Sequence, residues 1–125
     1  MKKLLLANVL GIFFTLSVSG DSVFYCEAKP LEGNRETLKM KEYTTISPII
    51  VIDEPNKKIT YSYNKSGRKW TNTYEIIAND GIHIAGKNIK QYGSINHIHF
   101  QVKEKLFTII YAGEFGNTMT FGNCQ

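Results

Sequence analysis

The fold class follows from residues 59–78, which read ITYSYNKSGRKWTNTYEIIA. Apolar and polar residues alternate over 59–63, which is the pattern of a strand with one buried face. The residues at 64–67, Asn-Lys-Ser-Gly, are typical of a tight turn. A second strand-like run follows over 69–78. The stretch therefore predicts two antiparallel strands joined by a short turn.

Runs of the same kind recur along the chain, separated by residues that favour turns. They span residues 23–28, 36–43, 46–53, 82–85, 94–102, 106–112 and 118–121. A loop is expected at Pro30, Gly33 and Asn34, where proline and glycine interrupt the pattern. No segment after residue 20 keeps the 3.6-residue apolar period of a helix. The sequence predicts an all-β antiparallel meander that forms a small barrel, closed or nearly closed, of about eight strands, with a β-sandwich as the alternative.

The two cysteines favour closure of that sheet. Cys26 and Cys124 are separated by 98 positions and lie near the two ends of the expected domain. An even number of cysteines in an exported chain predicts a disulfide, and two cysteines allow one pairing. Such a bridge requires the chain ends to meet, as adjacent first and last strands do. Two free thiols or paired metal ligands are the alternatives.

The first 20 residues have the pattern of a cleavable signal peptide. Lys2 and Lys3 precede an apolar stretch over 4–18, which is shorter than the roughly 20 residues of a spanning helix. Small residues before Asp21 suit cleavage there, which leaves a single domain over 21–125. An uncleaved N-terminal anchor is the alternative. The short basic start is typical of bacteria, so we expect a periplasmic or secreted protein with no membrane span after cleavage.

The composition argues against disorder and against nucleic-acid binding. Hydrophobic residues make up 42% of the chain and charged residues 21%, as in foldable globular proteins. The whole chain carries a net charge of +4, and without the two lysines of the expected signal 13 basic residues face 11 acidic ones, a balance of +2. That balance is too small to predict a nucleic-acid partner.

The strongest candidate for function is the turn after residue 63 with the aromatic residues around it. Basic residues at 65, 68 and 69 stand beside a tryptophan, and Lys57 and Lys58 extend the same acid-free stretch. Aromatic and basic side chains are typical of binding surfaces. The candidate partner-binding residues are Ser66, Gly67, Arg68, Lys69, Trp70, Tyr61, Tyr63 and Tyr74. The alternatives are a buried aromatic face of the sheet and a solvated basic loop.

Histidines offer a weaker signal. His97 and His99 are two apart in a predicted strand, so their side chains share one side and could hold one metal ion. Nothing in the sequence places His83 beside them as a third ligand, and a solvated pair is the alternative. The chain has no nucleophile elbow, phosphate-binding glycine loop or metalloprotease helix. We therefore expect a protein without enzymatic activity, catalytic residues, metal or cofactor.

The layout resembles that of the periplasmic inhibitors of c-type lysozyme, which are small, exported, all-β proteins with a disulfide tying the N-terminal region to the C-terminus. In that family a Ser-Gly loop element reaches into the cleft of the enzyme. The matching stretch here is Ser66-Gly67-Arg68-Lys69-Trp70, with Trp70 where the family pattern carries tyrosine. The resemblance implies a lysozyme as the partner.

The sequence as a whole predicts an exported binding module of the bacterial envelope or the secreted fraction, with a protein or another envelope component as its partner. An inhibitor of this kind predicts a filled core and a protruding basic loop. The alternative is a carrier that holds a small apolar ligand inside the barrel. A carrier predicts a cavity lined by residues such as Phe100, Ile109 and Phe121.

Overall fold

The computed structural model describes residues 21–90, 93–114 and 116–125. The expected signal peptide over residues 1–20 lies outside the described residues. Within the described ranges the chain forms one antiparallel sheet of nine strands. They are β2 (Asp21–Asn34), β3 (Lys39–Glu42), β4 (Ile49–Asp53), β5 (Lys58–Lys65), β6 (Arg68–Asn79), β7 (His83–Asn88), β8 (Ile95–Gln101), β9 (Leu106–Gly113) and β10 (Gly116–Cys124).

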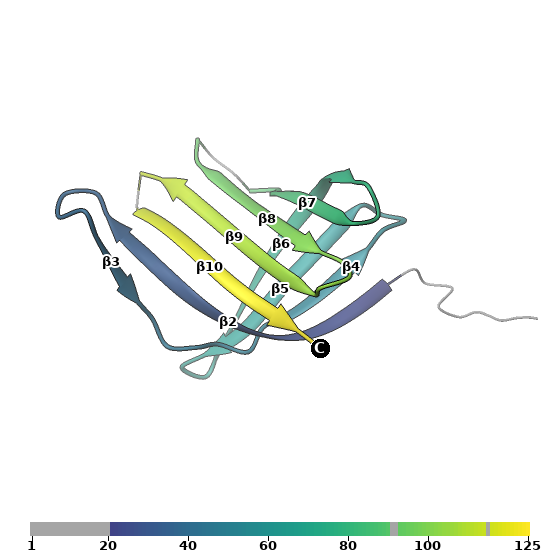
Figure 1. The fold of residues 1–125 in the computed structure, drawn as a ribbon, viewed down its shortest axis with the longest axis horizontal. Coiled ribbons are helices and arrows are strands. Elements are labelled where there is room, and N and C mark those ends of the chain that lie inside the picture. The colour runs from purple at the N-terminus through teal and green to yellow at the C-terminus, as the bar shows by residue number, and fades with distance from the viewer. Residues whose placement is uncertain (1–20, 91–92, 115) are drawn as a thin grey trace, which may run out of the picture.

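Eight of these strands close into a barrel (Figure 1). Each of the strands β4 to β9 pairs with the next strand along the chain, β2 pairs with β4, and β10 pairs with β2. Strand β3 is the ninth and pairs with the end of β2, outside the closed ring. The predicted all-β barrel is confirmed, and the pairing of β10 with β2 excludes the open edges of a sandwich.

Strand β2 is longer than the sequence predicted, and the loop expected at Pro30, Gly33 and Asn34 was wrong. These residues continue the strand: Pro30 and Gly33 pair with β10, and Asn34 pairs with Lys39 of β3. The carbonyl of Pro30 accepts a hydrogen bond from the N–H of Tyr43 at 3.0 Å, and Tyr43 lies in the connection after β3. Because N–H and C=O of one residue face the same neighbour in an antiparallel pair, the N–H that proline lacks would face this connection and not a regular ladder.

The predicted disulfide joins the first and last strands of the barrel. Cys26 and Cys124 are directly opposite each other in the β2–β10 ladder, and their sulfur atoms are 2.04 Å apart. The bond therefore links the two strands whose pairing closes the barrel. The prediction of one Cys26–Cys124 disulfide is confirmed.

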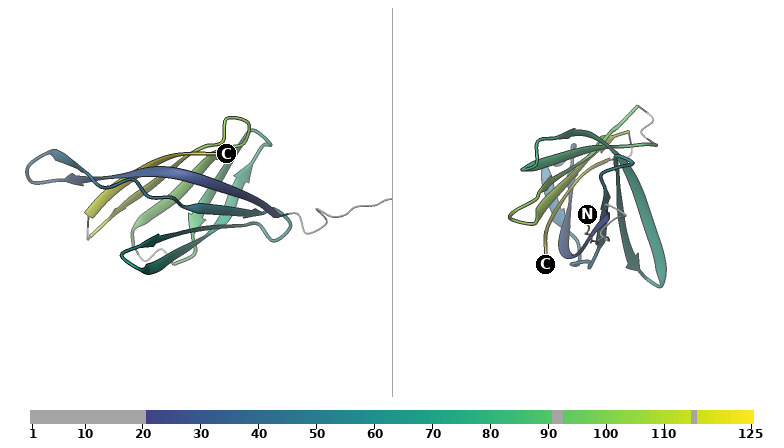
Figure 2. Two further views of the ribbon diagram at one scale, coloured as in Figure 1. Left: turned by 90° about the horizontal axis from the view of Figure 1, so that it is seen from below. Right: turned by 90° about the vertical axis from the view of Figure 1, so that its right-hand side faces the viewer.

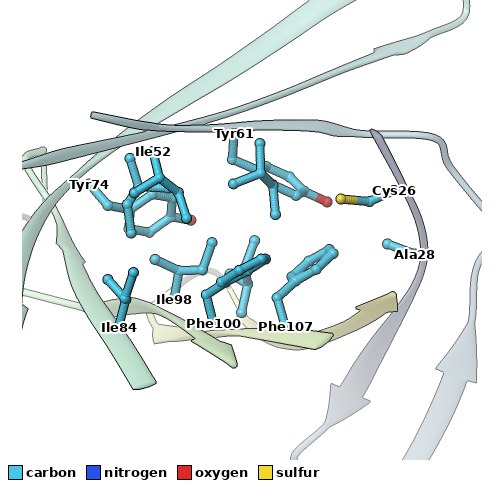
Figure 3. Close-up of a cluster of buried hydrophobic side chains, with 12 residues drawn as sticks. Cys26, Ala28, Ile52, Tyr61, Tyr74, Ile84, Ile98, Phe100 and Phe107 are labelled. Atoms are coloured by element: carbon cyan, nitrogen blue, oxygen red, sulfur yellow. The ribbon is translucent and has the colours of Figure 1, made fainter. Parts of the chain in front are cut away.

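The core fills one half of the barrel interior. Side chains from opposite walls point toward one another (Figure 3), and the aromatic rings of Phe24 and Phe100 lie 4.8 Å apart between centroids. The buried apolar residues are Cys26, Ala28, Ile50, Ile52, Ile59, Tyr61, Tyr74, Ile84, Ile98, Phe100, Phe107 and Ile109. We call the end with the β4–β5, β6–β7 and β8–β9 turns the closed end. The opposite end, with the β5–β6 and β9–β10 turns, is the open end.

Candidate functional site

The β5–β6 hairpin ends in a two-residue turn at the open end of the barrel. Lys65 pairs with Arg68, so Ser66 and Gly67 alone form the turn. Their φ angles are +56° and +74°, which is the backbone of a type I′ turn, whose twist matches that of the flanking strands. Figure 2 shows this turn at the periphery of the molecule, beyond the strands of the barrel wall. We refer to residues 64–70 as the hairpin tip.

The aromatic residues predicted on this hairpin share one face but lie at different depths. Tyr61 and Tyr74 are 3% and 1% exposed and belong to the core. Tyr63 and Trp70 are directly opposite each other near the tip, where Tyr63 is half-buried and Trp70 is 43% exposed. The predicted aromatic face therefore divides into two core residues and two residues that a partner can reach.

Cationic side chains of the hairpin tip lie over aromatic rings. The guanidinium of Arg68 is 4.7 Å from the ring centroid of Trp70, and Nζ of Lys65 is 5.3 Å from the ring centroid of Tyr43. Such contacts contribute about 0.5–1 kcal/mol at exposed sites. They hold the basic groups in place while leaving their charge accessible. A surface pocket of about 370 Å³ is lined by Tyr63, Lys65, Ser66, Arg68 and Trp70.

Tyr43, in the connection after β3, packs against the hairpin tip. Nζ of Lys41 is 5.0 Å from the ring centroid of Tyr43, on whose ring Lys65 also lies. The hydroxyl of Tyr43 donates a hydrogen bond to Oε1 of Glu32. This hydrogen bond is the main reason that the pKa of Tyr43 is raised. The hairpin tip thus contacts the β3 region as well as its own strands.

The basic stretch singled out in the sequence divides between the two ends of the barrel. Lys65, Arg68 and Lys69 lie at the open end, whereas Lys57 ends the β4–β5 turn and Lys58 begins β5, both at the closed end. Seven residues of strand, at about 3.3 Å each, separate Lys58 from Lys65 by roughly 23 Å. The stretch therefore does not form one continuous basic patch.

A pocket lined mostly by polar residues lies at the open end of the barrel. It was not predicted from the sequence. We call this pocket of about 210 Å³ the mouth pocket. It is lined by Ile46, Tyr61, Tyr63, Asn72, Tyr74, Asn96, Ile109, Tyr111, Thr118 and Thr120. Tyr63 is shared with the pocket at the hairpin tip. The sequence did carry one signal for a polar interior. In the alternating pattern of the strand, Asn72 lies on the same face as Trp70 and Tyr74.

The residues named for an apolar ligand cavity do not surround one. Phe100 is fully buried and packs against Phe24. Phe121 is 46% exposed and lines a shallow pocket with Lys29 and Leu106. Of the three residues named for a carrier, Ile109 is the one that lines the mouth pocket.

The structure brings His83 and His99 together on neighbouring strands. Nδ1 of His83 lies 3.0 Å from Nε2 of His99, and both side chains are exposed. His97, the other metal candidate from the sequence, is on the same strand as His99. Across the described residues no group of three or more histidine, cysteine, aspartate or glutamate side chains is arranged to hold a metal ion.

Comparisons with known proteins give no family for this chain. No protein-family model matches the sequence, and no curated protein is significantly similar to it. The described residues contain no helix that is long and apolar enough to cross a membrane. The class defined by the fold is therefore a disulfide-closed, eight-stranded antiparallel barrel with one additional strand.

Proposed function

We propose that the protein is an exported, non-enzymatic binding module of the bacterial envelope or the secreted fraction, and that it contacts a partner protein through the hairpin tip. The observation that carries this proposal is the contact between Arg68 and Trp70 at an exposed two-residue turn. Residues 1–20 support export by their sequence pattern. The Cys26–Cys124 disulfide also fits an oxidising compartment.

The chemistry of the hairpin tip suits a protein interface. Tryptophan, tyrosine and arginine dominate binding energy at interfaces because each joins a large contact area to a polar group. Trp70 has apolar area left to bury, since 43% of it is exposed. The tight turn and the contacts of Lys65 and Arg68 with aromatic rings limit the conformational entropy that binding would remove.

The positive charge of the hairpin tip favours a partner with an acidic surface. Lys65, Arg68 and Lys69 give the hairpin tip three positive charges, with no acidic residue between positions 64 and 70. Complementary charge raises association rates and selects partners, so the matching surface is an acidic cleft. Glycosidases of the lysozyme type carry two carboxyl groups in the cleft. The resemblance of Ser66–Trp70 to the loop element of c-type lysozyme inhibitors points to the same partner class.

The proposal is tested by measuring binding to immobilised c-type lysozyme and inhibition of its lytic activity. The protein is used with its disulfide oxidised. Trp70→Ala and Arg68→Glu should each weaken binding about tenfold or more, which corresponds to at least 1.4 kcal/mol. Phe121→Ala and Lys58→Glu are matched controls, because Phe121 is 46% exposed on β10 and Lys58 is exposed at the start of β5, at the closed end. Both controls should bind within about twofold of the unaltered protein.

If lysozyme is not bound, the same four variants serve as baits against envelope and secretion extracts. A partner retained by the unaltered protein and both controls, but lost with both tip variants, would support the binding module and replace lysozyme as its target. Retention that is equal for all variants would show that the hairpin tip is not the contact surface. Retention of no protein by the unaltered bait would refute a protein partner.

A further inference from the structure

The mouth pocket has a size that selects small ligands. Its volume of about 210 Å³ corresponds to roughly seven water molecules at about 30 Å³ each. Pockets for drug-sized molecules occupy about 300–1,000 Å³. The filled half of the barrel beneath, with Ile59, Ile98 and Phe100 fully buried, prevents a long ligand from extending further inward. A fatty acyl chain does not fit these limits, whereas a single six-membered ring does.

Eight of the ten described residues that line the mouth pocket have polar, uncharged side chains, and the other two are Ile46 and Ile109. Hydroxyl groups come from tyrosines 63, 74 and 111 and from threonines 118 and 120, side-chain amides come from asparagines 72 and 96, and Tyr61 lines the pocket while its own hydroxyl is buried. Of the residues that the structure describes, no lysine, arginine, aspartate, glutamate or histidine lines this pocket. Hydroxyl and amide groups both donate and accept hydrogen bonds. They therefore match a neutral ligand that carries several hydroxyl groups, and they provide no counter-charge for an ionic one.

Three phenols of the lining, those of Tyr61, Tyr63 and Tyr74, have pKa values that favour their neutral form. Burial raises the pKa of Tyr61, Tyr63 and Tyr74 above the ordinary tyrosine value. A neutral phenol keeps its proton and can donate a hydrogen bond. The flat rings of the tyrosines also offer apolar faces beside these polar groups. A sugar ring has the same two kinds of surface, with hydroxyl groups at its edge and C–H groups on its faces.

Hydrogen-bonding contacts with neighbouring side chains hold the amide groups of Asn72 and Asn96 in place. The hydroxyl of Tyr74 donates a hydrogen bond to Oδ1 of Asn96 at 3.0 Å. Nδ2 of the buried Asn88 lies 3.5 Å from Oδ1 of Asn72, and Oδ1 of Asn88 accepts a hydrogen bond from the N–H of Lys90 at 2.8 Å. A site whose polar groups are already fixed loses less entropy when a ligand binds.

We propose that the mouth pocket binds one ring of a neutral sugar, free or as the end of a glycan. This goes beyond the proposed function, because it assigns a ligand to the interior of the barrel mouth and not to the hairpin tip. Tyr63 is the residue common to both sites. The ring is held by hydrogen bonds to asparagine and threonine side chains and lies against the tyrosine rings.

The test is a titration of the oxidised, isotopically labelled protein with neutral monosaccharides, followed by the shifts of its backbone amide resonances. The probes are glucose, galactose and N-acetylglucosamine, with glucuronate and glucosamine as charged counterparts. We expect at least one neutral sugar to shift resonances of residues that line the mouth pocket and to bind more tightly than both charged sugars. Thr118→Val should weaken this binding roughly five- to tenfold, because it removes a hydroxyl at nearly constant volume.

Thr108→Val is the matched control. Thr108 lies on β9 between the buried residues Phe107 and Ile109, so its side chain points away from the barrel interior. This control should bind the sugar like the unaltered protein, and urea unfolding verifies that both variants fold. The proposal is overturned if no neutral sugar shifts the pocket resonances, if a charged sugar binds best, or if the two valine variants behave alike.

The same variants separate this proposal from the proposed function. Thr118→Val should leave any partner binding that depends on Trp70 unchanged. Trp70→Ala should leave the sugar titration unchanged, since Trp70 does not line the mouth pocket. Failure of the sugar titration therefore does not affect the hairpin tip, and failure of the tip variants does not affect the mouth pocket.

Discussion

Two buried tyrosines that differ in hydrogen bonding should respond oppositely to loss of the hydroxyl. Tyr61 is 3% exposed, and its hydroxyl has no hydrogen-bond partner among the described residues. Tyr74 is 1% exposed, and its hydroxyl donates to Asn96 at 3.0 Å. Replacing either by phenylalanine keeps the ring and removes one oxygen atom. The pair therefore isolates the energetics of the hydroxyl group.

The expected magnitudes follow from the partners. Burying an unpaired hydroxyl costs about 1–3 kcal/mol, so Tyr61→Phe should raise the free energy of unfolding by about 1 kcal/mol. Tyr74→Phe should lower it by about 1 kcal/mol, because a hydrogen bond worth about 0.5–1.5 kcal/mol is lost. The two variants should then differ by about 2 kcal/mol, or roughly 30-fold in the folding equilibrium constant.

The assay is equilibrium unfolding in urea with the disulfide intact. Both variants should keep the denaturant slope of the unaltered protein, so that shifts in midpoint report stability alone. The reasoning is refuted if Tyr61→Phe lowers the free energy of unfolding by more than about 0.5 kcal/mol, or if the two variants lose the same amount. Either outcome would mean that the Tyr61 hydroxyl has a stabilising partner.

The same two residues predict how stability depends on alkaline pH. Burial is the main reason that the pKa of both phenols is raised above 10. A raised pKa in the folded state gives stability that is fully present below the pKa of the unfolded chain and is lost as the pH rises above about 10. Above that pH the unfolded chain ionises first, so alkali unfolds the barrel. Tyr61→Phe should shift this unfolding to higher pH, as measured by tyrosinate absorbance.

Three further variants test the disulfide that closes the barrel, the packing of its interior and the hairpin turn. Replacing both Cys26 and Cys124 by alanine should lower the free energy of unfolding by about 2–5 kcal/mol, measured in urea, because a long loop is no longer closed; a loss below 1 kcal/mol would contradict this. Gly122→Ala should lower it by about 1–3 kcal/mol or more, since its Cβ would lie 2.1 Å from the ring of Phe107 and 2.8 Å from the backbone oxygen of Glu27. An unchanged thermal midpoint would show that both neighbours can move aside at little cost. Gly67→Ala should lower the free energy of unfolding by about 1–2 kcal/mol, because alanine is strained at a φ of +74°. No steric clash adds to this strain, since no atom lies within 4 Å of the added carbon. Calorimetry should therefore find Gly122→Ala less stable than Gly67→Ala.

The strand pattern of the fold could be predicted because alternation and turn residues are local signals. Residues 59–63 and 69–78 form the predicted hairpin, and the cysteine positions required the chain ends to meet. The continuation of β2 through Pro30 and Gly33 could not be predicted from local rules. It depends on β10, a strand more than 80 residues further along the chain, which supplies the ladder for that segment.

The candidate site was predictable in part. The exposed tip with Arg68 beside Trp70 follows from the turn and the spacing of two residues within one strand. The mouth pocket was not predictable, because its lining comes from strands that are distant in sequence, such as Asn72 on β6 and Thr118 on β10. The contact of His83 with His99 was missed for the same reason, since it depends on the register of β7 with β8.

The two ends of the barrel interior are filled differently, with apolar side chains at the closed end and polar ones at the open end. This difference relates the stability of the barrel to the proposed binding. An eight-stranded barrel has an interior just wide enough for side chains to fill, and the closed end does so with isoleucine and phenylalanine. At the open end the inward positions carry Asn72, Asn96 and Thr118, where apolar residues of similar size would bury more area and add stability. Departures from the pattern that favours stability concentrate where a protein binds. The polar lining of the open end therefore supports the two proposals of binding at the barrel mouth and at its hairpin tip, while the closed end and the disulfide hold the strands that carry both sites.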